Sequence, residues 1–338
     1  MKAFKSSLRF FAGRALSVLL LFAAEAGVLY SSNYLFFLEV QGIAGYSSAA
    51  GKAVFYSMSR MEAMQKPSLG FDYVQKFAGA GGDIATLAVQ ARLAVNAEGG
   101  DTIEPQLYNA YLRLKLGGSY IWAGHNRPKF GLASWFDSHG QLLQPTAMNG
   151  FGFDRDWGVG LERDLSWGNA GVSLTTGSGM SLYLKGNYFL SGRIAKGVLN
   201  RDNYTVGLSA AAGKVLDVMG VHLMNDKPAL FEMLATDATW LRNNWENRVE
   251  VMAGKRGSTA AWAVFWRTGV GLLEESRLKL EAQPAVFRMN GKTNVQVSAG
   301  ISYSAGADWT LRAMVQRDRE TKDTRIVFQV YYYKGMRL

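Results

Sequence analysis

The sequence predicts an all-β fold, a transmembrane antiparallel β-barrel of about sixteen strands, and three observations support it. Segments of about ten residues alternate polar and apolar side chains from about Leu35 to Lys334, and turn residues separate them, which is typical of membrane barrels. Aromatic residues gather at segment ends, as Trp240 and Trp245 do. The chain also combines 12% aromatic with 19% charged residues, a composition that excludes an intrinsically disordered protein.

The first 26 residues indicate export. A basic beginning is followed by the short apolar run Ala15 to Ala24, and Ala24-Glu25-Ala26 fits the small-x-small rule for signal cleavage. The run is shorter than the about 20 residues that a membrane-spanning helix needs. We therefore expect residues 1–26 to be a signal peptide and residues 27–338 to form a single outer-membrane barrel domain. A retained N-terminal anchor is the alternative.

The segments that alternate between turn residues are the expected strands. In the clearest one, Val295, Val297 and Ile301 share one face while Asn294 and Gln296 share the other, as a side-chain period of two requires. In chain order we expect strands at 35–47, 69–79, 84–96, 105–116, 119–127, 156–165, 168–177, 186–198, 203–213, 229–241, 245–255, 260–271, 275–287, 292–304, 307–319 and 323–334.

Three features leave the strand number open. Alternation is poor in 229–241, the strand 35–47 begins with an unbroken apolar run, and Pro284 cannot donate a hydrogen bond to a neighbouring strand. A soluble β-sandwich would also alternate, since its apolar faces point inward. An even count is expected of single-chain bacterial barrels, so fourteen or eighteen strands would also fit.

Short and long connections alternate along the chain. The longer ones are residues 48–68, 97–104, 128–155 and 214–228. The tight ones are Ala80–Asp83, Gly117–Ser119, Ser166–Gly168, Asn200–Asn203, Arg242–Asn244, Leu272–Ser276 and Ser304–Ala307. Short turns on the periplasmic side and long loops on the other side are the asymmetry of outer-membrane barrels.

The alternation assigns an excess of basic side chains to the barrel interior. The expected basic residues are Lys76, Arg92, Arg113, Lys115, Arg193, Arg248, Arg267, Arg277, Lys279, Arg312 and Arg325. The expected acidic residues are Asp72, Glu232, Glu246, Glu250, Glu281 and Asp318. Clustered Arg and Lys favour anions in a pore. The alternative is a set of ion pairs that only solvate a water-filled interior.

The segment 128–155 is too apolar for a loop in water. It carries Trp135, Phe136, Phe151 and Phe153, so we expect it to fold back into the barrel and narrow it. The charged residues expected near the constriction are Arg127, Lys129, Asp137, His139, Asp154 and Arg155. The alternative is a loop that packs against the wall and has only a structural role.

The sequence offers little for catalysis or cofactors. The chain has no cysteine and three histidines, which excludes thiolate and cysteine-ligated metal sites and argues against a multi-histidine metal centre, so we expect no cofactor. Asp137, Ser138 and His139 are adjacent, and adjacent residues do not converge as a catalytic relay requires. Asp154, His125 and Ser134 could converge, which leaves an outer-membrane hydrolase as a minor alternative. Basic residues are interleaved with acidic ones, so nucleic acid is not expected as a partner.

Residues 105–177 resemble the phosphate-selective porin group of outer-membrane barrels. The resemblance rests on the Ala-Tyr run in Leu107 to Lys115, on Gly124-His125-Asn126-Arg127-Pro128-Lys129-Phe130-Gly131, which opens the long third loop, and on Asp154 to Gly160. It implies a sixteen-stranded, commonly trimeric anion channel. The chain departs from the group because Lys129 stands between Pro128 and Phe130, the third loop has no lysine-rich stretch, and the C-terminus is Leu338 rather than an aromatic residue.

Together these observations predict a passive, water-filled, mildly anion-preferring porin in the outer membrane of a Gram-negative-type bacterium, and not an enzyme. The expected partners are outer-membrane lipid and lipopolysaccharide, small anionic or neutral solutes, the barrel-assembly machinery and two further copies in a homotrimer. The expected selectivity residues are Arg92, Arg113, Lys115, Arg127, Lys129, Arg155, Arg248, Arg277 and Arg312. The alternative is a barrel that serves as scaffold or sheath for an exported partner protein or cytochrome.

Overall fold

The structure is a computed structural model that describes residues 31–54, 66–79, 82–95 and 103–336. The predicted signal peptide lies outside these residues. The strands are β1 (Ser31–Ser47), β2 (Lys52–Val54), β3 (Ser68–Gly79), β4 (Gly82–Val95), β5 (Ile103–Leu116), β6 (Ser119–Asn126), β7 (Asp156–Leu165), β8 (Gly168–Thr175), β9 (Tyr188–Lys196), β10 (Tyr204–Met219), β11 (His222–Arg242), β12 (Trp245–Arg256), β13 (Thr259–Leu272), β14 (Leu278–Met289), β15 (Lys292–Ser304), β16 (Trp309–Asp318) and β17 (Asp323–Met336).

Helices are few and short in the described residues. They are η2 (Leu132–Ser134), η3 (Thr146–Asn149), α2 (Leu199–Asp202) and η4 (Glu274–Ser276). Within the described part of the chain, none of them has the length and apolar character to span a membrane.

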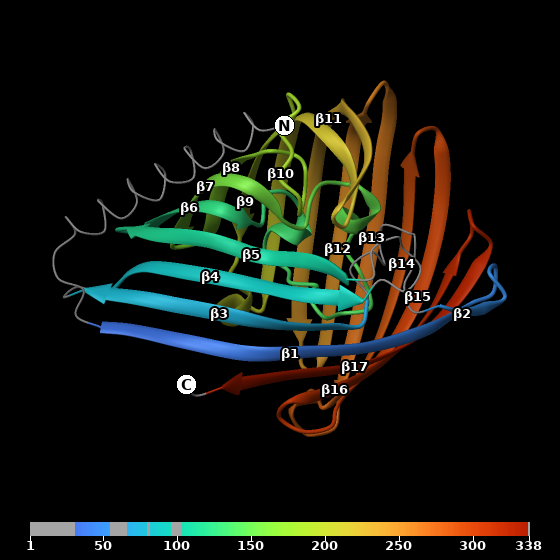
Figure 1. Cartoon of the computed structure of the whole chain (residues 1–338). Helices are drawn as coiled ribbons and strands as arrows, with labels where there is room; N and C mark the ends of the chain where they lie inside the picture. The colour runs from blue at the N-terminus through green and yellow to red at the C-terminus, as the bar shows by residue number, and fades with distance from the viewer. Residues whose placement is uncertain (1–30, 55–65, 80–81, 96–102, 337–338) are drawn as a thin grey trace.

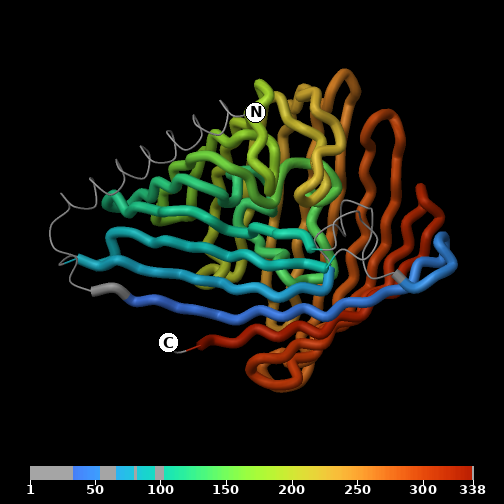
Figure 2. The backbone as a smooth tube through the Cα atoms, in the orientation of Figure 1, coloured from blue at the N-terminus to red at the C-terminus, as the bar shows by residue number. Residues whose placement is uncertain are grey.

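The long strands close into one antiparallel barrel. Each pairs with its neighbours in the sequence, and β1 pairs with β17 from Phe36 and Met336 to Ser47 and Arg325, so the first and last strands lie side by side (Figures 1 and 2). The three-residue β2 pairs with the last residues of β1, beyond the point where the pairing of β1 with β3 ends, and adds no separate strand to the wall. The remaining sixteen described strands form the wall, which confirms the predicted fold class and count.

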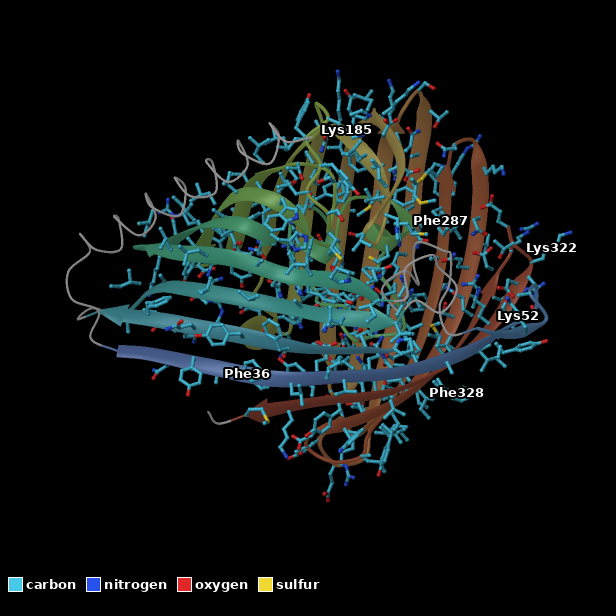
Figure 3. All side chains as sticks on the ribbon, in the orientation of Figure 1. Phe36, Lys52, Lys185, Phe287, Lys322 and Phe328 are labelled. Atoms are coloured by element: carbon cyan, nitrogen blue, oxygen red, sulfur yellow. The ribbon has the colours of Figure 1, made fainter. Side chains whose placement is uncertain are left out.

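The side-chain alternation separates a lipid-facing surface from the interior. On β17, Ile326, Phe328 and Val330 are exposed, whereas Gln329 is buried inside. Figure 3 labels Phe328 on this outer face. Exposed aromatic side chains ring one end of the wall, and they are Trp167, Tyr204, Trp240, Trp245, Tyr303 and Trp309. An apolar outer band with an aromatic girdle is the outer surface of a membrane barrel. The protein is therefore an outer-membrane-type barrel.

We call the end with the aromatic girdle and the turns 165–168 and 242–245 the turn end, and the opposite end, where residues 127–155 connect β6 to β7, the loop end. The predicted alternation of short and long connections holds only in the first half of the chain. In the second half, β12 to β17 are joined by tight turns at both ends of the barrel.

The predicted long connection 214–228 is wrong. Strand β10 continues to Met219 and β11 starts at His222, so most of this segment is strand. The ladder between β10 and β11 shifts register around Asp217, and a two-residue turn begins at Gly220 with φ 58°. The polar residues at 214–228 therefore extend a hairpin beyond the rest of the loop end instead of forming a loop.

Pro284 is accommodated by a gap in one ladder. It lies in β14 opposite Val297 of β15, and the pairing of β14 with β13 is interrupted between Phe265–Ala285 and Thr268–Ala282. The hydrogen bonds between β13 and β14 are therefore missing at the position where proline has no N–H to donate.

The interior contains a hydrophobic core on the side of β9 to β13. Phe130 and Phe151, from the connection between β6 and β7, pack there on Phe189, Phe231 and Met252. Because Phe231 and Met233 point inward, Glu232 between them is exposed on the outer wall. The prediction that Glu232 faces the lumen is therefore wrong, and Asp237 is the acidic residue of β11 that is buried inside.

Candidate functional site

The candidate site is built around the connection from β6 to β7, which we call the crossing loop (residues 127–155). It leaves β6 after Asn126 and turns at Gly131, whose φ of 61° favours glycine. The short helices η2 and η3 follow. Most of its side chains are buried, including Phe130, Phe136 and Phe151. This burial accounts for the apolar composition that distinguishes the segment in the sequence.

The carboxylate of Glu250 on β12 anchors two separate parts of the crossing loop. The backbone N–H of Leu132 donates to its Oε1 at 2.5 Å, and the hydroxyl of Thr146 donates to its Oε2. Glu250 is fully buried, and a Cβ at Gly131 would collide with its Oε1. Two loop positions fourteen residues apart are thus held at one point of the wall.

Two more strands hold the middle of the crossing loop. The Arg267 guanidinium of β13 donates to the Leu143 carbonyl at 3.2 Å and to Gln141 Oε1 at 2.7 Å. On β14, the Gln283 amide donates to the Gln144 carbonyl at 2.9 Å. The loop therefore starts between β6 and β7 and contacts strands on another part of the wall.

Four of the charged residues expected near the constriction form one cluster near the loop base, and they are Arg127, Asp137, Asp154 and Arg155. Arg155 Nη2 lies 3.1 Å from Asp137 Oδ1, and Arg127 pairs with the other oxygen of Asp137. Arg155 also pairs with Asp154 and donates to Asn109 Oδ1 at 3.1 Å. Burial by itself would raise the pKa of Asp137, but the charges of Arg155 and Arg127 outweigh it and hold the pKa below its usual range.

A second cluster joins the crossing loop to β1. His139 Nε2 lies 2.7 Å from Glu39 Oε2, and Arg92 Nη1 lies 3.3 Å from Glu39 Oε1. The His139 ring also packs edge-on against the Tyr108 ring, with 3.9 Å between centroids. Asp137 and His139 therefore have separate ionic partners, Arg155 and Glu39, and do not act on one another as a catalytic relay would.

Two polar cavities lie on the turn-end side of the crossing loop. The first has a volume of about 450 Å³ and is lined by the four inward basic side chains Arg113, Arg127, Lys129 and Arg193 and by the three acidic ones Asp137, Glu162 and Asp164, whereas Arg163 shares the outward face of β7 with Leu161. The second has a volume of about 200 Å³ and is lined by four basic side chains and one acidic one, which are Arg267, Arg277, Lys279, Arg312 and Glu281. Basic residues are in excess in both.

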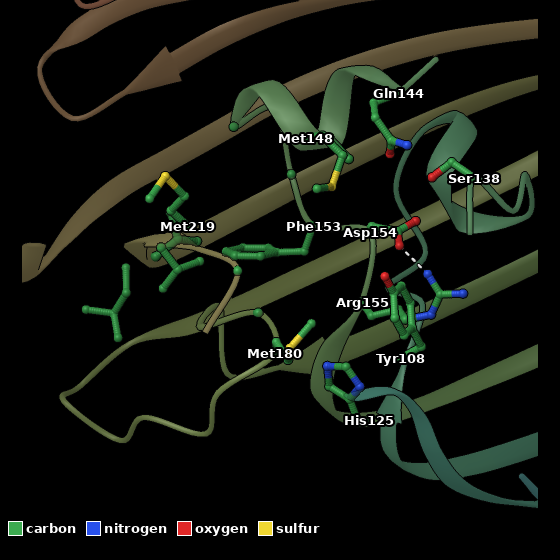
Figure 4. A pocket seen from close by; sticks show the side chains of 18 of the residues that line it. Tyr108, His125, Ser138, Gln144, Met148, Phe153, Asp154, Arg155, Met180 and Met219 are labelled. Atoms are coloured by element: carbon green, nitrogen blue, oxygen red, sulfur yellow. Dashed lines mark hydrogen bonds and ion pairs between the residues drawn. The ribbon is translucent and has the colours of Figure 1, made fainter. Parts of the chain in front are cut away.

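A third cavity, of about 110 Å³, lies on the loop-end side and is largely apolar (Figure 4). Met148, Phe153, Met180 and Met219 surround it, and the Asp154–Arg155 ion pair borders it. In the described residues, no group of three His, Cys, Asp or Glu side chains could hold a metal ion.

The predicted selectivity residues are spread over the interior. Lys129 Nζ pairs with Glu162 at 2.7 Å, and Arg113 lies over the Tyr120 ring at 4.6 Å in the same cavity. Arg248 pairs with Glu246 and lies 4.0 Å from the centre of the Phe136 ring. Arg312 donates to Gln329 Oε1 at 2.9 Å.

Two of the predicted residues are exposed near the turn end of the barrel. Lys115 is exposed near the end of β5, beside the turn to β6. Arg277 is exposed at the turn end, where its guanidinium donates to the Tyr303 hydroxyl at 3.3 Å. Trp135 of the crossing loop contacts β11, where its Nε1 donates to Asp237 Oδ1 at 3.4 Å.

Sequence reasoning missed two acidic anchors of this site. Glu39 is buried in β1 and binds both Arg92 and His139. The signal that could have placed it in the lumen is a charged residue between the apolar residues Leu38 and Val40. Asp237 is buried in β11 and accepts from Arg193 Nη2 at 2.7 Å. No signal in β11 alone marks Asp237, because the inward face of that strand also carries apolar residues.

Comparisons with known proteins identify the fold. The chain is similar to OmpF of Salmonella typhi in complex with daunomycin (TM-score 0.63, 11% identity, 89% of this chain and 97% of that chain). It is similar to a loop L8 deletion mutant of OmpT, an outer membrane protein of Vibrio cholerae (TM-score 0.62, 10% identity, 90% and 99%). It is also similar to an anion-selective porin from Comamonas acidovorans (TM-score 0.59, 12% identity, 90% and 100%).

The sequence itself gives no such match. No family model matches it, and no curated protein matches it. The resemblance to the phosphate-selective group therefore stays a prediction, and the structural comparisons establish that the chain has the barrel fold of outer-membrane porins.

Proposed function

We propose that the protein is a passive, water-filled porin with a mild preference for anions, narrowed by the crossing loop. The main support for the anion preference is the excess of basic side chains in both cavities on the turn-end side of the crossing loop. In a narrow polar passage, clustered Arg and Lys lower the barrier for anions and raise it for cations. The proposal includes no catalytic step and no cofactor.

The loop end faces the cell exterior in this proposal, and the turn end faces the periplasm. Porins place short turns at the periplasmic side, and the termini of the described chain, at Ser31 and Met336, lie at the turn end. A homotrimer is the assembly we propose, because the structural neighbours include OmpT in a trimer form. Phosphate is one candidate anion, since Arg can bind phosphate through paired hydrogen bonds.

Arg113 provides the most direct test of anion preference. It lines the larger basic cavity, and its guanidinium lies over Tyr120 without an ion pair in the described residues. Reversal potentials should be measured in planar bilayers under a KCl gradient for the wild-type protein and Arg113→Glu. We expect the chloride-to-potassium permeability ratio to fall in the variant. The fall should be largest at about 0.01 M salt, where the Debye length is about 30 Å, and small at about 1 M.

Matched variants make this experiment decisive. Arg127→Glu with Lys129→Glu should reduce the ratio further, since both residues line the same cavity. Lys292→Glu with Lys322→Glu changes the net charge by the same amount as this double variant. Both lysines lie at the loop end of hairpins outside the cavities, so the permeability ratio should stay unchanged. A ratio at low salt that is equal in all four proteins would contradict anion selection by these residues.

A second candidate is a scaffold or sheath for an exported partner. It is favoured by the hydrophobic core that occupies the interior beside β9 to β13. Single-channel recordings distinguish the two candidates, because a porin gives stepwise currents in a bilayer and a filled scaffold gives none.

A further inference from the structure

The outer wall over β7 to β12 carries a shallow groove made by small residues. Gly192, Ala210, Ala212 and Ala253 form its floor, and longer apolar side chains border it. The bordering residues are Leu161, Val172, Leu190, Ile194, Leu208 and Leu234. On a lipid-facing wall, such a groove has the shape and polarity to hold an acyl chain.

The strand register places charged residues at the loop-end limit of this groove. Ala212 of β10 is paired with Glu232 of β11, which is paired with Lys255 of β12. Lys214 lies two residues beyond Ala212 on the same face of β10. Residues directly opposite on paired strands have Cβ atoms about 5 Å apart and diagonal neighbours about 7 to 8 Å. Lys214, Glu232 and Lys255 therefore form one compact cluster.

This cluster lies at the edge of the apolar band. Lys214 is ten residues along β10 from the girdle residue Tyr204, and Lys255 is ten residues along β12 from Trp245. At about 3.3 Å per residue and a tilt of about 40°, ten residues rise about 25 Å, which is the height of the lipid-facing band. Both lysines are thus at the level where the headgroups of one leaflet begin.

The two ammonium groups are available to a ligand. Lys214 and Lys255 are exposed, and neither has an ion pair within 4.0 Å among the described residues. Their stems pass over apolar surface and their charges reach the headgroup level, as long basic side chains do at membrane interfaces. Each lysine at this level attracts anionic headgroups.

We propose that this surface binds a phosphorylated glycolipid of the outer leaflet, with an acyl chain in the groove and a phosphate at Lys214 and Lys255. Glu232 favours a sugar headgroup over a simple phospholipid. A carboxylate beside the phosphate site repels a second phosphate, but it accepts hydrogen bonds from sugar hydroxyl or amide N–H groups. The proposal relies on the orientation given above, with the loop end outside the cell, and it is independent of ion conduction.

Native mass spectrometry of the full chain in detergent tests the binding. Bis-phosphorylated lipid A is the probe, and phosphatidic acid, whose phosphate carries no headgroup hydroxyl or amide, is the comparison lipid. We expect Lys214→Ala with Lys255→Ala to weaken lipid A binding about 25-fold, since each basic residue near a membrane surface contributes about fivefold. Lys196→Ala is the matched control, because Lys196 is also exposed on the outer wall but lies near the turn end of β9. An unchanged dissociation constant in the double variant, or an equal loss in Lys196→Ala, would overturn the proposal.

Two further variants test the headgroup and the groove. Glu232→Leu should weaken the binding of lipid A more than that of phosphatidic acid, and an equal effect on both would contradict the sugar contact. Gly192→Leu with Ala210→Leu fills the groove on the outside of the barrel and should weaken lipid A binding at an unchanged oligomeric mass. A change of oligomeric mass with unchanged lipid binding would identify the face as a contact between copies and overturn the proposal. An unchanged circular dichroism spectrum of each variant shows that the barrel has folded.

Discussion

Removal of the Glu250 carboxylate should release the crossing loop. Glu250→Ala deletes the acceptor of the Leu132 N–H and of the Thr146 hydroxyl, which belong to different parts of the loop. A hydrogen bond to a charged group contributes about 1.5 to 3 kcal/mol, so the loss of both costs about 3 to 6 kcal/mol. Every 1.4 kcal/mol is tenfold, so the ratio of held to released loop should fall by about 10² to 10⁴.

The remaining anchors decide how large the effect becomes. Arg267 and Gln283 still hold residues 143 and 144 by their carbonyl oxygens, so the segment around η2 and Thr146 should move while the middle of the loop stays at the wall. We expect single-channel recordings of Glu250→Ala to show a larger mean conductance and more frequent current fluctuations than those of the wild-type protein. Glu250→Gln keeps an acceptor oxygen and should lie between the two.

A control separates release of the loop from a general loss of interior charge. Asp318→Ala removes a carboxylate of β16 that accepts from Asn294 and Gln296 and not from the crossing loop. Its conductance should equal that of the wild-type protein. If Glu250→Ala folds into a barrel with the conductance and noise of the wild type, the reasoning that Glu250 holds the loop in the pore is refuted.

Two other predictions concern pH and orientation. The pKa of Asp137 is held below its usual value of about 3.9, so its ion pairs stabilise the loop above that pH and are lost as the pH falls further. A change of conductance is therefore expected as the pH falls below about 4, and Asp137→Asn should show the changed conductance already above that pH and lack this acid transition; an acid transition that persists unchanged in Asp137→Asn would contradict the assignment. Single cysteines at Gly118 and Lys322 lie at opposite ends of the barrel, and a membrane-impermeant thiol reagent on intact cells should label position 322 but not 118, with the reverse pattern showing that the barrel is inverted.

Most of the wall could be predicted from the sequence because the membrane imposes a period of two on every strand. Strands such as β15 and β16 have apolar outward and polar inward residues, so their limits were predicted to within a few residues. The hairpin of β10 and β11 was not predicted beyond Gly213, because it extends past the apolar band and its outward residues no longer need to be apolar.

The site was harder to predict than the wall. The loop residues were identified by composition, since aromatic side chains in a long connection need burial. Their partners Glu39, Glu250 and Asp237 lie far away in the sequence, and only the closed barrel brings them to the loop. Glu250 was expected in the lumen as a pore charge, whereas its contacts show that it binds the backbone and a hydroxyl of the loop.

Because side chains alternate with a period of two, the residues that point inward on β11 determine which residues point outward. Phe130 and Phe151 of the crossing loop pack with Phe231 and Met233, which fixes these residues of β11 on the inside. Glu232, between them, must then point outward, where it faces Lys255. A slip of one residue would bury Glu232 in the hydrophobic core and place two large apolar side chains among the outer charges. The packing of the crossing loop therefore also determines the charge pattern on the outer wall, so a variant that loosens Phe231 inside should weaken lipid A binding outside without a change at any lysine.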